Sequence, residues 1–95
     1  MTFVWDSDKA AANLKKHKVS FDEASTVFSD PLALIFPDEA HSIAEGREII
    51  IGHSILDRLL LVCFTERKEN LIRVISARQA SRRERRDYEE NARLT

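Results

Sequence analysis

Arginine side chains gather in one stretch near the C-terminus, and their number and spacing make them the first candidates for chemistry. From Arg67 to Arg86 the chain carries eight basic residues and two acidic ones, whereas its overall formal net charge is −1. A nearly neutral protein that concentrates positive charge in one segment presents a cationic surface. We therefore expect a polyanionic ligand, and RNA is the leading candidate.

Arginines with a nearby proton-transfer group are sufficient for RNA cleavage without a metal ion. The ribose 2′-OH is a built-in nucleophile, so the protein must position it, move a proton and stabilise the pentavalent phosphate. Planar guanidinium groups bind phosphate oxygens bidentately. Glu66 and His41 are the candidates for the general base. Arg78 ends a predicted strand just before a predicted helix, so we expect Arg78, Arg82 and Arg83 to converge.

Other kinds of catalytic site find little support in the sequence. The histidines, His17, His41 and His53, lack metal-ligand spacing, and Cys63 is the single cysteine, so no metal or other cofactor is expected. Two glycines cannot build a phosphate-binding loop. The residues alone leave three interpretations open: nucleic-acid binding, binding of an acidic protein partner, and an arginine-rich helix that serves only solubility.

The elements that must position these residues are predicted from periodicity and capping signals. Ser20–Glu23 and Ser81–Glu84 each match a capping box, which marks the start of a helix. We predict an α+β fold in which two N-terminal helices pack on one face of an antiparallel sheet of about four strands, followed by a polar, arginine-rich C-terminal helix. The first predicted helix spans about 8–17, the second begins at Ser20, and the third begins near Arg82. The predicted strands span 32–36, 47–54, 58–67 and 71–78, with a short one at 3–5.

Three details of this arrangement matter for the site. Strict alternation along strand 71–78 predicts that Arg73 and Arg78 lie on opposite faces of the sheet. The first helix is expected to pack through alanines and Leu14, with Asn13 turned elsewhere. The basic cluster at 15–18 either complements the helix dipole or forms a second phosphate-contacting patch.

Length and composition indicate a single domain spanning residues 1–95. Hydrophobic residues make up 43% of the chain and charged residues 33%, which is typical of globular proteins. The longest apolar run, 59–64, is too short to span a membrane, and the N-terminus lacks the pattern of a signal peptide. We therefore expect a cytoplasmic protein.

Short motifs with a recognisable order run through nearly the whole chain. They are Phe3-Val4-Trp5-Asp6, Lys16-His17, Val19 to Ala24, Asp30-Pro31, His41-Ser42, Ile51-Gly52, Thr65-Glu66-Arg67, Ile75 to Arg78 and Arg82 to Arg85. In this order the chain resembles the BrnT-type toxins, the toxin subunits of bacterial type II toxin–antitoxin systems. One departure is Lys18, where the family often has glycine.

The resemblance implies a RelE-like ribonuclease that cleaves RNA without a metal and inhibits translation. It also implies a cognate DNA-binding antitoxin and a toxin homodimer within a toxin–antitoxin heterotetramer. The alternatives are a non-catalytic basic binding module and a degenerate, inactive toxin. Catalytic positions carried over by motif are Glu66, Arg67, Arg78 and Arg83, and the residues expected to bind RNA are Arg82, Arg73, Lys68 and His41.

Overall fold

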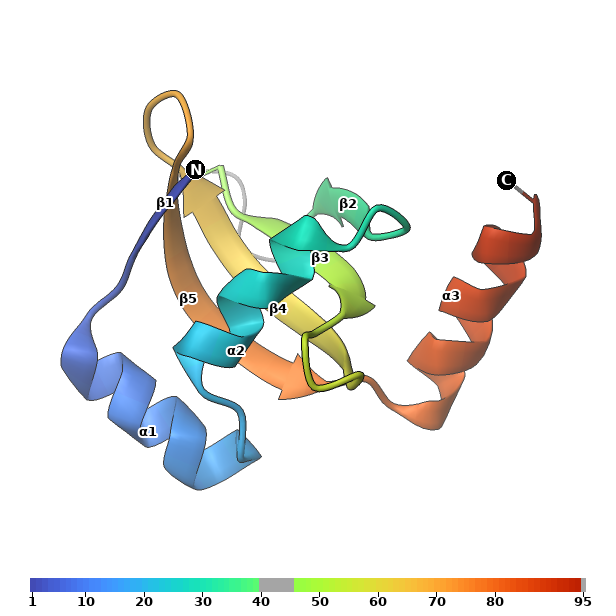
Figure 1. Ribbon diagram of the computed structural model, residues 1–95, viewed down its shortest axis with the longest axis horizontal. Coiled ribbons are helices and arrows are strands. Elements are labelled where there is room, and N and C mark those ends of the chain that lie inside the picture. The colour runs from blue at the N-terminus through green and yellow to red at the C-terminus, as the bar shows by residue number, and fades with distance from the viewer. Residues whose placement is uncertain (40–45, 95) are drawn as a thin grey trace.

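The computed structural model of the chain describes residues 1–39 and 46–94, with side chains of the last helix described as far as Asn91. Within these residues an α+β fold combines three α-helices with a five-stranded sheet (Figure 1). The elements are β1 (Thr2–Val4), α1 (Ser7–His17), α2 (Phe21–Thr26), the 3₁₀ helix η1 (Val27–Ser29), β2 (Leu34–Pro37), β3 (Glu48–His53), β4 (Leu59–Glu66), β5 (Leu71–Gln79) and α3 (Arg82–Leu94).

The sheet has the strand order β1-β5-β4-β3-β2. Strands β2 to β5 form the predicted antiparallel meander, in which each strand pairs with the next along the chain. The predicted short strand at 3–5 forms as β1 and adds a fifth strand to the sheet, because it pairs with the edge of β5 with Phe3 opposite Ile72. This pairing is parallel, so the sheet is mixed rather than purely antiparallel.

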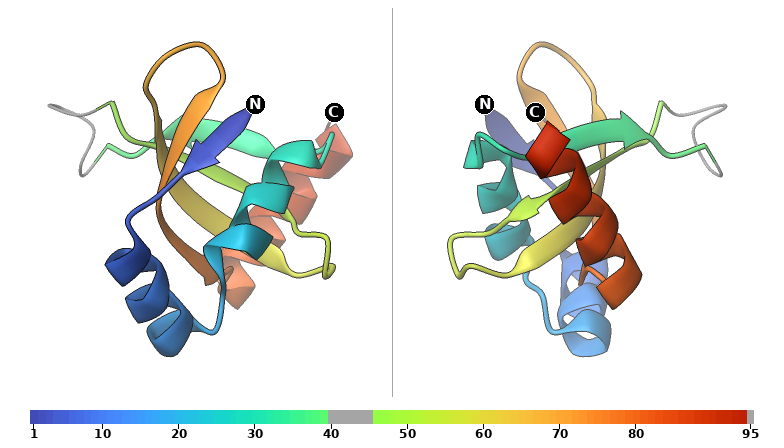
Figure 2. Two further views of the ribbon diagram at one scale, coloured as in Figure 1. Left: turned by 60° about the vertical axis from the view of Figure 1, so that its left-hand side comes forward. Right: turned by 90° about the vertical axis from the view of Figure 1, so that its right-hand side faces the viewer.

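Helices α1 and α2 cover one face of the sheet (Figure 2, left). The main core lies between α2 and that face, where fully buried Phe21 and Val27 pack with Leu60, Val62 and Val74. Apolar side chains at alternate positions of β4 and β5 point into this core because successive side chains of a strand face opposite sides.

Helix α1 is fixed to the sheet by Asn13 rather than by an apolar stripe. The Asn13 Nδ2 atom donates to the carbonyls of Val19 and Ala77, each at 2.9 Å, and its Oδ1 atom accepts from the Ala77 amide at 3.1 Å. The prediction for this helix was wrong for Asn13, which is buried, and for Leu14, which is 49% exposed, whereas Ala10 packs against the core as predicted. Lys18 ends the helix in the left-handed conformation (φ 61°) that glycine adopts most easily.

Half of the first predicted capping box is formed. The Ser20 hydroxyl accepts from the Glu23 amide at 3.0 Å, but the Glu23 carboxylate does not return to Ser20. It accepts from the Ser54 hydroxyl at 2.6 Å and pairs with the Arg58 guanidinium, which also donates to the Lys18 carbonyl. The hydrogen bond from Arg58 lowers the pKa of the buried Glu23. Because Glu23 belongs to α2 and Ser54 and Arg58 belong to the β3–β4 turn, these contacts join the helix to the turn.

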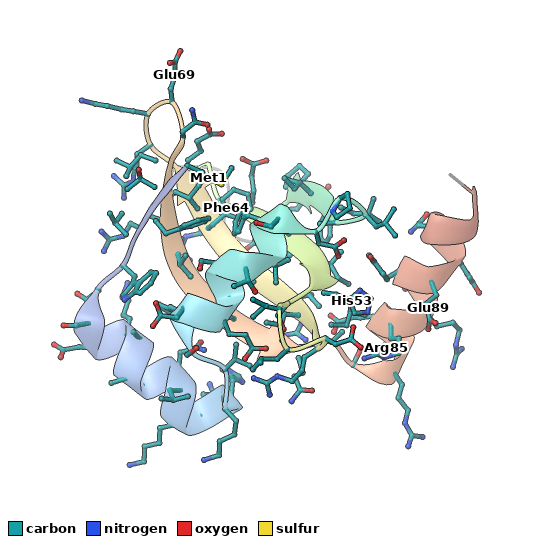
Figure 3. All side chains as sticks on the ribbon, in the orientation of Figure 1. Met1, His53, Phe64, Glu69, Arg85 and Glu89 are labelled. Atoms are coloured by element: carbon teal, nitrogen blue, oxygen red, sulfur yellow. The ribbon has the colours of Figure 1, made fainter. Side chains whose placement is uncertain are left out.

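Helix α3 lies on the sheet face opposite α1 and α2, so only the two N-terminal helices share one face, as predicted (Figure 2, right). Tyr88 is the anchor: its ring packs with Ile51 and Leu59, and its hydroxyl donates to the Leu32 carbonyl at 3.3 Å. Figure 3 shows that His53 on β3 points toward this helix, and the His53 and Tyr88 rings meet edge to face. Tyr88 is therefore the apolar anchor of an otherwise polar helix.

Candidate active site

A β-bulge in β5 determines which arginines share a surface. Cys63 of β4 pairs with Ser76, but the next residue, Phe64, pairs with Val74, so Ile75 is the extra residue. An extra residue shifts the side-chain alternation by one position. Arg73 and Arg78 therefore lie on the same face, opposite α1 and α2, and the prediction of opposite faces was wrong.

A cavity of about 490 Å³ opens on this face near the end of β5, on the part of the strand that β1 does not cover, and the C-terminal end of α1 also reaches it. Strands β3, β4 and β5 supply its apolar part. The charged and titratable groups that line it are Lys16, His17, Asp38, Arg47 and Arg78. Three permanent cations and an imidazole surround a single carboxylate, so the cavity suits an anion attached to an apolar or aromatic group.

Several distant segments are brought together at this cavity. The hydrogen bonds of Asn13 with Ala77 hold the C-terminal end of α1 beside β5, which explains how Lys16 and His17 come to lie near Arg78. Asp38 and Arg47 flank the β2–β3 connection, where the Asp38 amide donates to the Arg47 carbonyl at 3.0 Å.

Sequence analysis did not select Asp38, Arg47 or Lys16 as site residues. For Lys16 and His17 the sequence does contain a signal, since one interpretation of the basic cluster at 15–18 is a phosphate-contacting patch. No local pattern singled out Asp38, whose carboxylate accepts a 3.7 Å hydrogen bond from the Cys63 thiol.

Arg78 is held by helix α3 through a two-pronged ion pair. Its Nη1 and Nη2 atoms donate to the two carboxylate oxygens of Glu84 at 2.7 and 2.8 Å. The Glu84 carboxylate also accepts from the Ser81 amide at 2.8 Å, while the Ser81 hydroxyl accepts from the Glu84 amide at 3.2 Å, so the second predicted capping box is complete. The hydrogen bonds from Arg78, with those from Ser81, lower the pKa of Glu84 to about 2.

Glu66, Arg67 and Lys68 lie at the other end of the β4–β5 hairpin. Because the two strands are antiparallel, β4 ends where β5 begins, and the six residues that separate Ile72, the partner of Glu66, from Arg78 span roughly 20 Å. Figure 3 shows this separation: Glu69 marks the β4–β5 turn, and Arg85 marks α3 on the far side of the molecule. Within a single chain, Glu66 and Arg67 therefore lie too far from Arg78 to share a site with it.

The remaining predicted residues divide by location. Arg82 and Arg83 are exposed in the first turn of α3, close in sequence to Arg78. Arg67 lies on the same face as Arg73, and its Nε atom donates to the Thr65 hydroxyl at 3.4 Å. His41 lies outside the described residues.

Residues 1–39 and 46–94 contain no group of three or more His, Cys, Asp or Glu side chains arranged to hold a metal ion. In the same ranges, none of the helices is both long and apolar enough to cross a membrane.

The chain matches one protein-family model and is similar to a solved structure. A family model described as ribonuclease toxin, BrnT, of type II toxin-antitoxin system matches residues 5–84. Among solved structures, the chain is similar to the 1.1 Å crystal structure of the Brucella abortus ribonuclease toxin, BrnT, with 28% sequence identity and a TM-score of 0.68. The match covers 86% of this chain and 99% of the Brucella chain. No curated protein matches the chain.

Proposed function

The chain belongs to the BrnT family of ribonuclease toxins of type II toxin–antitoxin systems, and from this premise we propose that it is a metal-independent endoribonuclease. Its active site is the cavity of about 490 Å³ on the sheet face opposite α1 and α2. The observation that carries the proposal is that His17 and Arg78, from α1 and β5, line this same cavity. An imidazole and a guanidinium are the groups that proton transfer and phosphate binding require.

The three cations and the imidazole of the cavity each have a role in attack by the ribose 2′-OH. Arg78 binds the scissile phosphate and stabilises the charge that develops on its oxygens. Lys16 and Arg47 add to this positive potential. His17 is the proton-transfer group, because the ring nitrogens of an imidazole can accept and donate a proton. The apolar part of the cavity receives a base next to the scissile phosphate.

The arginines outside the cavity bind the rest of the RNA. Arg67 and Arg73 share the sheet face with Arg78, and the roughly 20 Å from the β4–β5 turn to the cavity matches about six stacked nucleotides at about 3.4 Å each. Arg82 and Arg83, at the start of α3, contact the RNA strand. Lys68 extends the basic surface at the β4–β5 turn. Glu66 lies at the same strand end as Arg67, and the Thr65 hydroxyl, which accepts from the Arg67 Nε atom, orients that arginine.

The family also supports the biological setting. We propose that the chain inhibits translation in the cytoplasm, that a cognate DNA-binding antitoxin neutralises it, and that two toxin chains join two antitoxins in a heterotetramer. Co-purification of the chain with the antitoxin, followed by mass measurement in solution, tests this assembly. A complex of one toxin with one antitoxin would contradict the heterotetramer.

RNA cleavage by the purified chain is the direct test of the active site. In excess EDTA we expect cleavage that leaves a 5′-hydroxyl product and stops when a 2′-deoxynucleotide replaces the scissile residue. Arg78→Ala should lower kcat/KM on the order of 100-fold, and His17→Ala by a similar factor. Lys16→Ala should lower it about tenfold, whereas Lys15→Ala, one position away and outside the cavity, is the matched control.

Three results would count against this proposal. Cleavage that requires a divalent metal ion would rule out the metal-independent mechanism. Full activity of the Arg78→Ala variant would show that this cavity is not the active site. Absence of both cleavage and growth arrest, when the folded chain is expressed alone in a bacterial host, would favour the non-catalytic binding module or the degenerate toxin.

A further inference from the structure

The pair between Arg78 and Glu84 leaves a defined part of the guanidinium group available. Arginine has five N–H groups in a planar fork. Among the described residues, Nη1 and Nη2 each donate to Glu84, and Nη1 also donates to the Gln79 carbonyl at 3.3 Å. The Nε–H and the second Nη2–H form the other edge of the fork, and that edge matches the spacing of two phosphate oxygens.

Arg78 stands between two cavities, and Glu84 belongs to only one of them. The first is the proposed active site of about 490 Å³, which Arg78 lines without Glu84. The second, of about 370 Å³, lies between the sheet and α3 and is lined by both residues together with Tyr88. Glu84 therefore reaches Arg78 from the α3 side.

We propose that Glu84 is a positioning residue, which holds the Arg78 guanidinium so that its Nε–Nη2 edge faces the active-site cavity. This inference rests on the proposed function, because it assigns Arg78 to the scissile phosphate. An arginine at a strand end without such a partner samples many rotamers, and this conformational entropy is lost when the side chain binds the transition state. The ion pair fixes one arrangement before RNA binds.

The same carboxylate makes the position of Arg78 depend on helix α3. Glu84 is the third residue of the helix and accepts from the Ser81 amide, so its carboxylate is fixed by the helix start. Tyr88, one turn further along, attaches the helix to the sheet. Only 31% of the Glu84 side chain is exposed, compared with 45% for Arg78. The helix thus supports the arginine, although Glu84 does not touch RNA.

Glu84→Gln is the test because glutamine keeps the size of the side chain and one acceptor oxygen. Because an NH2 donor replaces the second carboxylate oxygen, glutamine cannot form two parallel N–H···O bonds with Nη1 and Nη2, so the two-pronged pair is lost. We expect kcat on RNA to fall on the order of 10- to 100-fold with a smaller change in KM, since a misplaced catalytic group acts mainly on the transition state. Glu84→Asp, which restores the charge on a shorter arm, should recover part of kcat.

Two controls separate positioning from helix capping. Ser81→Ala removes the other half of the capping box without touching Arg78, and we expect it to leave kcat within about twofold. In an Arg78→Ala background, Glu84→Gln should have no further effect on kcat, because the two residues act as a unit. An equal loss of kcat in both backgrounds, or a loss reproduced by Ser81→Ala, would overturn the inference.

NMR of the Arg78 guanidinium gives a readout that does not depend on cleavage. A two-pronged pair slows rotation about the C–N bonds, so the Nη protons of Arg78 should give separate signals in the parent chain and one averaged signal in Glu84→Gln. Identical spectra would overturn the inference. Separate signals in a parent chain that does not cleave RNA would remove the proposed function while leaving the ordering of Arg78 by Glu84 in place.

Discussion

Asn13 is the single residue on which the relation of α1 to the sheet most depends. Its side chain satisfies both the N–H and the C=O of Ala77, on the part of β5 that β1 does not cover, and also the Val19 carbonyl beyond the end of α1. A buried backbone group without a partner costs more than a hydrogen bond contributes when it is formed. The amide of Asn13 therefore places Lys16 and His17 beside the proposed active site.

We expect Asn13→Ala to lower the free energy of unfolding by about 2–4 kcal/mol, because it leaves three buried backbone groups without partners. Urea unfolding followed by circular dichroism measures the change. Asn91→Ala is the matched control, since Asn91 is exposed and donates only to the Asp87 carbonyl within its own helix, and its effect should stay within about 0.5 kcal/mol. Equal effects of the two substitutions would contradict this role of Asn13.

At the scale of elements, α3 is attached in two different ways. Tyr88 contributes apolar burial against Ile51 and Leu59, and Glu84 contributes an ion pair with Arg78. Figure 3 also shows Arg85 and Glu89 on this helix, one turn apart. A helix this polar gains little from its own propensity, so its position depends on these two contacts.

The ion pair makes the attachment of α3 depend on pH. The pKa of Glu84 is lowered from 4.5 to about 2, chiefly by the hydrogen bonds from Arg78, so its contribution to stability is complete above pH 4.5 and is lost as the pH falls toward 2. We expect Glu84→Gln to be less stable than the parent by about 1 kcal/mol at pH 6, allowing for solvent screening, and equally stable near pH 2. Thermal unfolding of both proteins across this range measures the difference, with Glu89→Gln as the control.

A difference in stability between the parent and Glu84→Gln that stays constant from pH 6 to pH 2 would show that the carboxylate charge is not the cause. In that case the loss of the helix cap, rather than the ion pair with Arg78, would account for the effect.

At the scale of the whole molecule, the two sheet faces have different tasks. One face packs against α1 and α2 and contains the main core. The other carries the proposed active site, helix α3 and the arginines of the β4–β5 hairpin. A chain with a formal net charge of −1 can still present a local basic surface, because its segment from Arg67 to Arg86 carries eight basic residues and two acidic ones.

Charge on this face should govern RNA binding more than catalysis. We expect Arg67→Ala and Arg73→Ala to raise KM with little change in kcat, and each to reduce the slope of log affinity against log salt by about 0.7. Binding titrations with an uncleavable 2′-deoxy oligonucleotide at several salt concentrations measure the slope. An unchanged slope for both variants would mean that RNA does not follow the β4–β5 hairpin.

Local sequence signals were sufficient for the elements and for the family. The capping residues Ser20 and Ser81 and the apolar runs of β3 to β5 predicted where helices and strands form, because such signals act between residues close in the chain. The arginine-rich stretch indicated a cationic surface for the same reason: charge is a property of composition. The order of short motifs identified the family, which the match over residues 5–84 confirmed.

Tertiary structure alone decided which of these residues act together. The bulge at Ile75 shifts the alternation by one position and so brings Arg73 and Arg78 to one face. Antiparallel pairing separates Arg67 from Arg78, and the Asn13 contacts bring His17 to the cavity instead. These relations depend on pairings between residues as many as 64 positions apart, and no periodicity within a single segment encodes such a pairing.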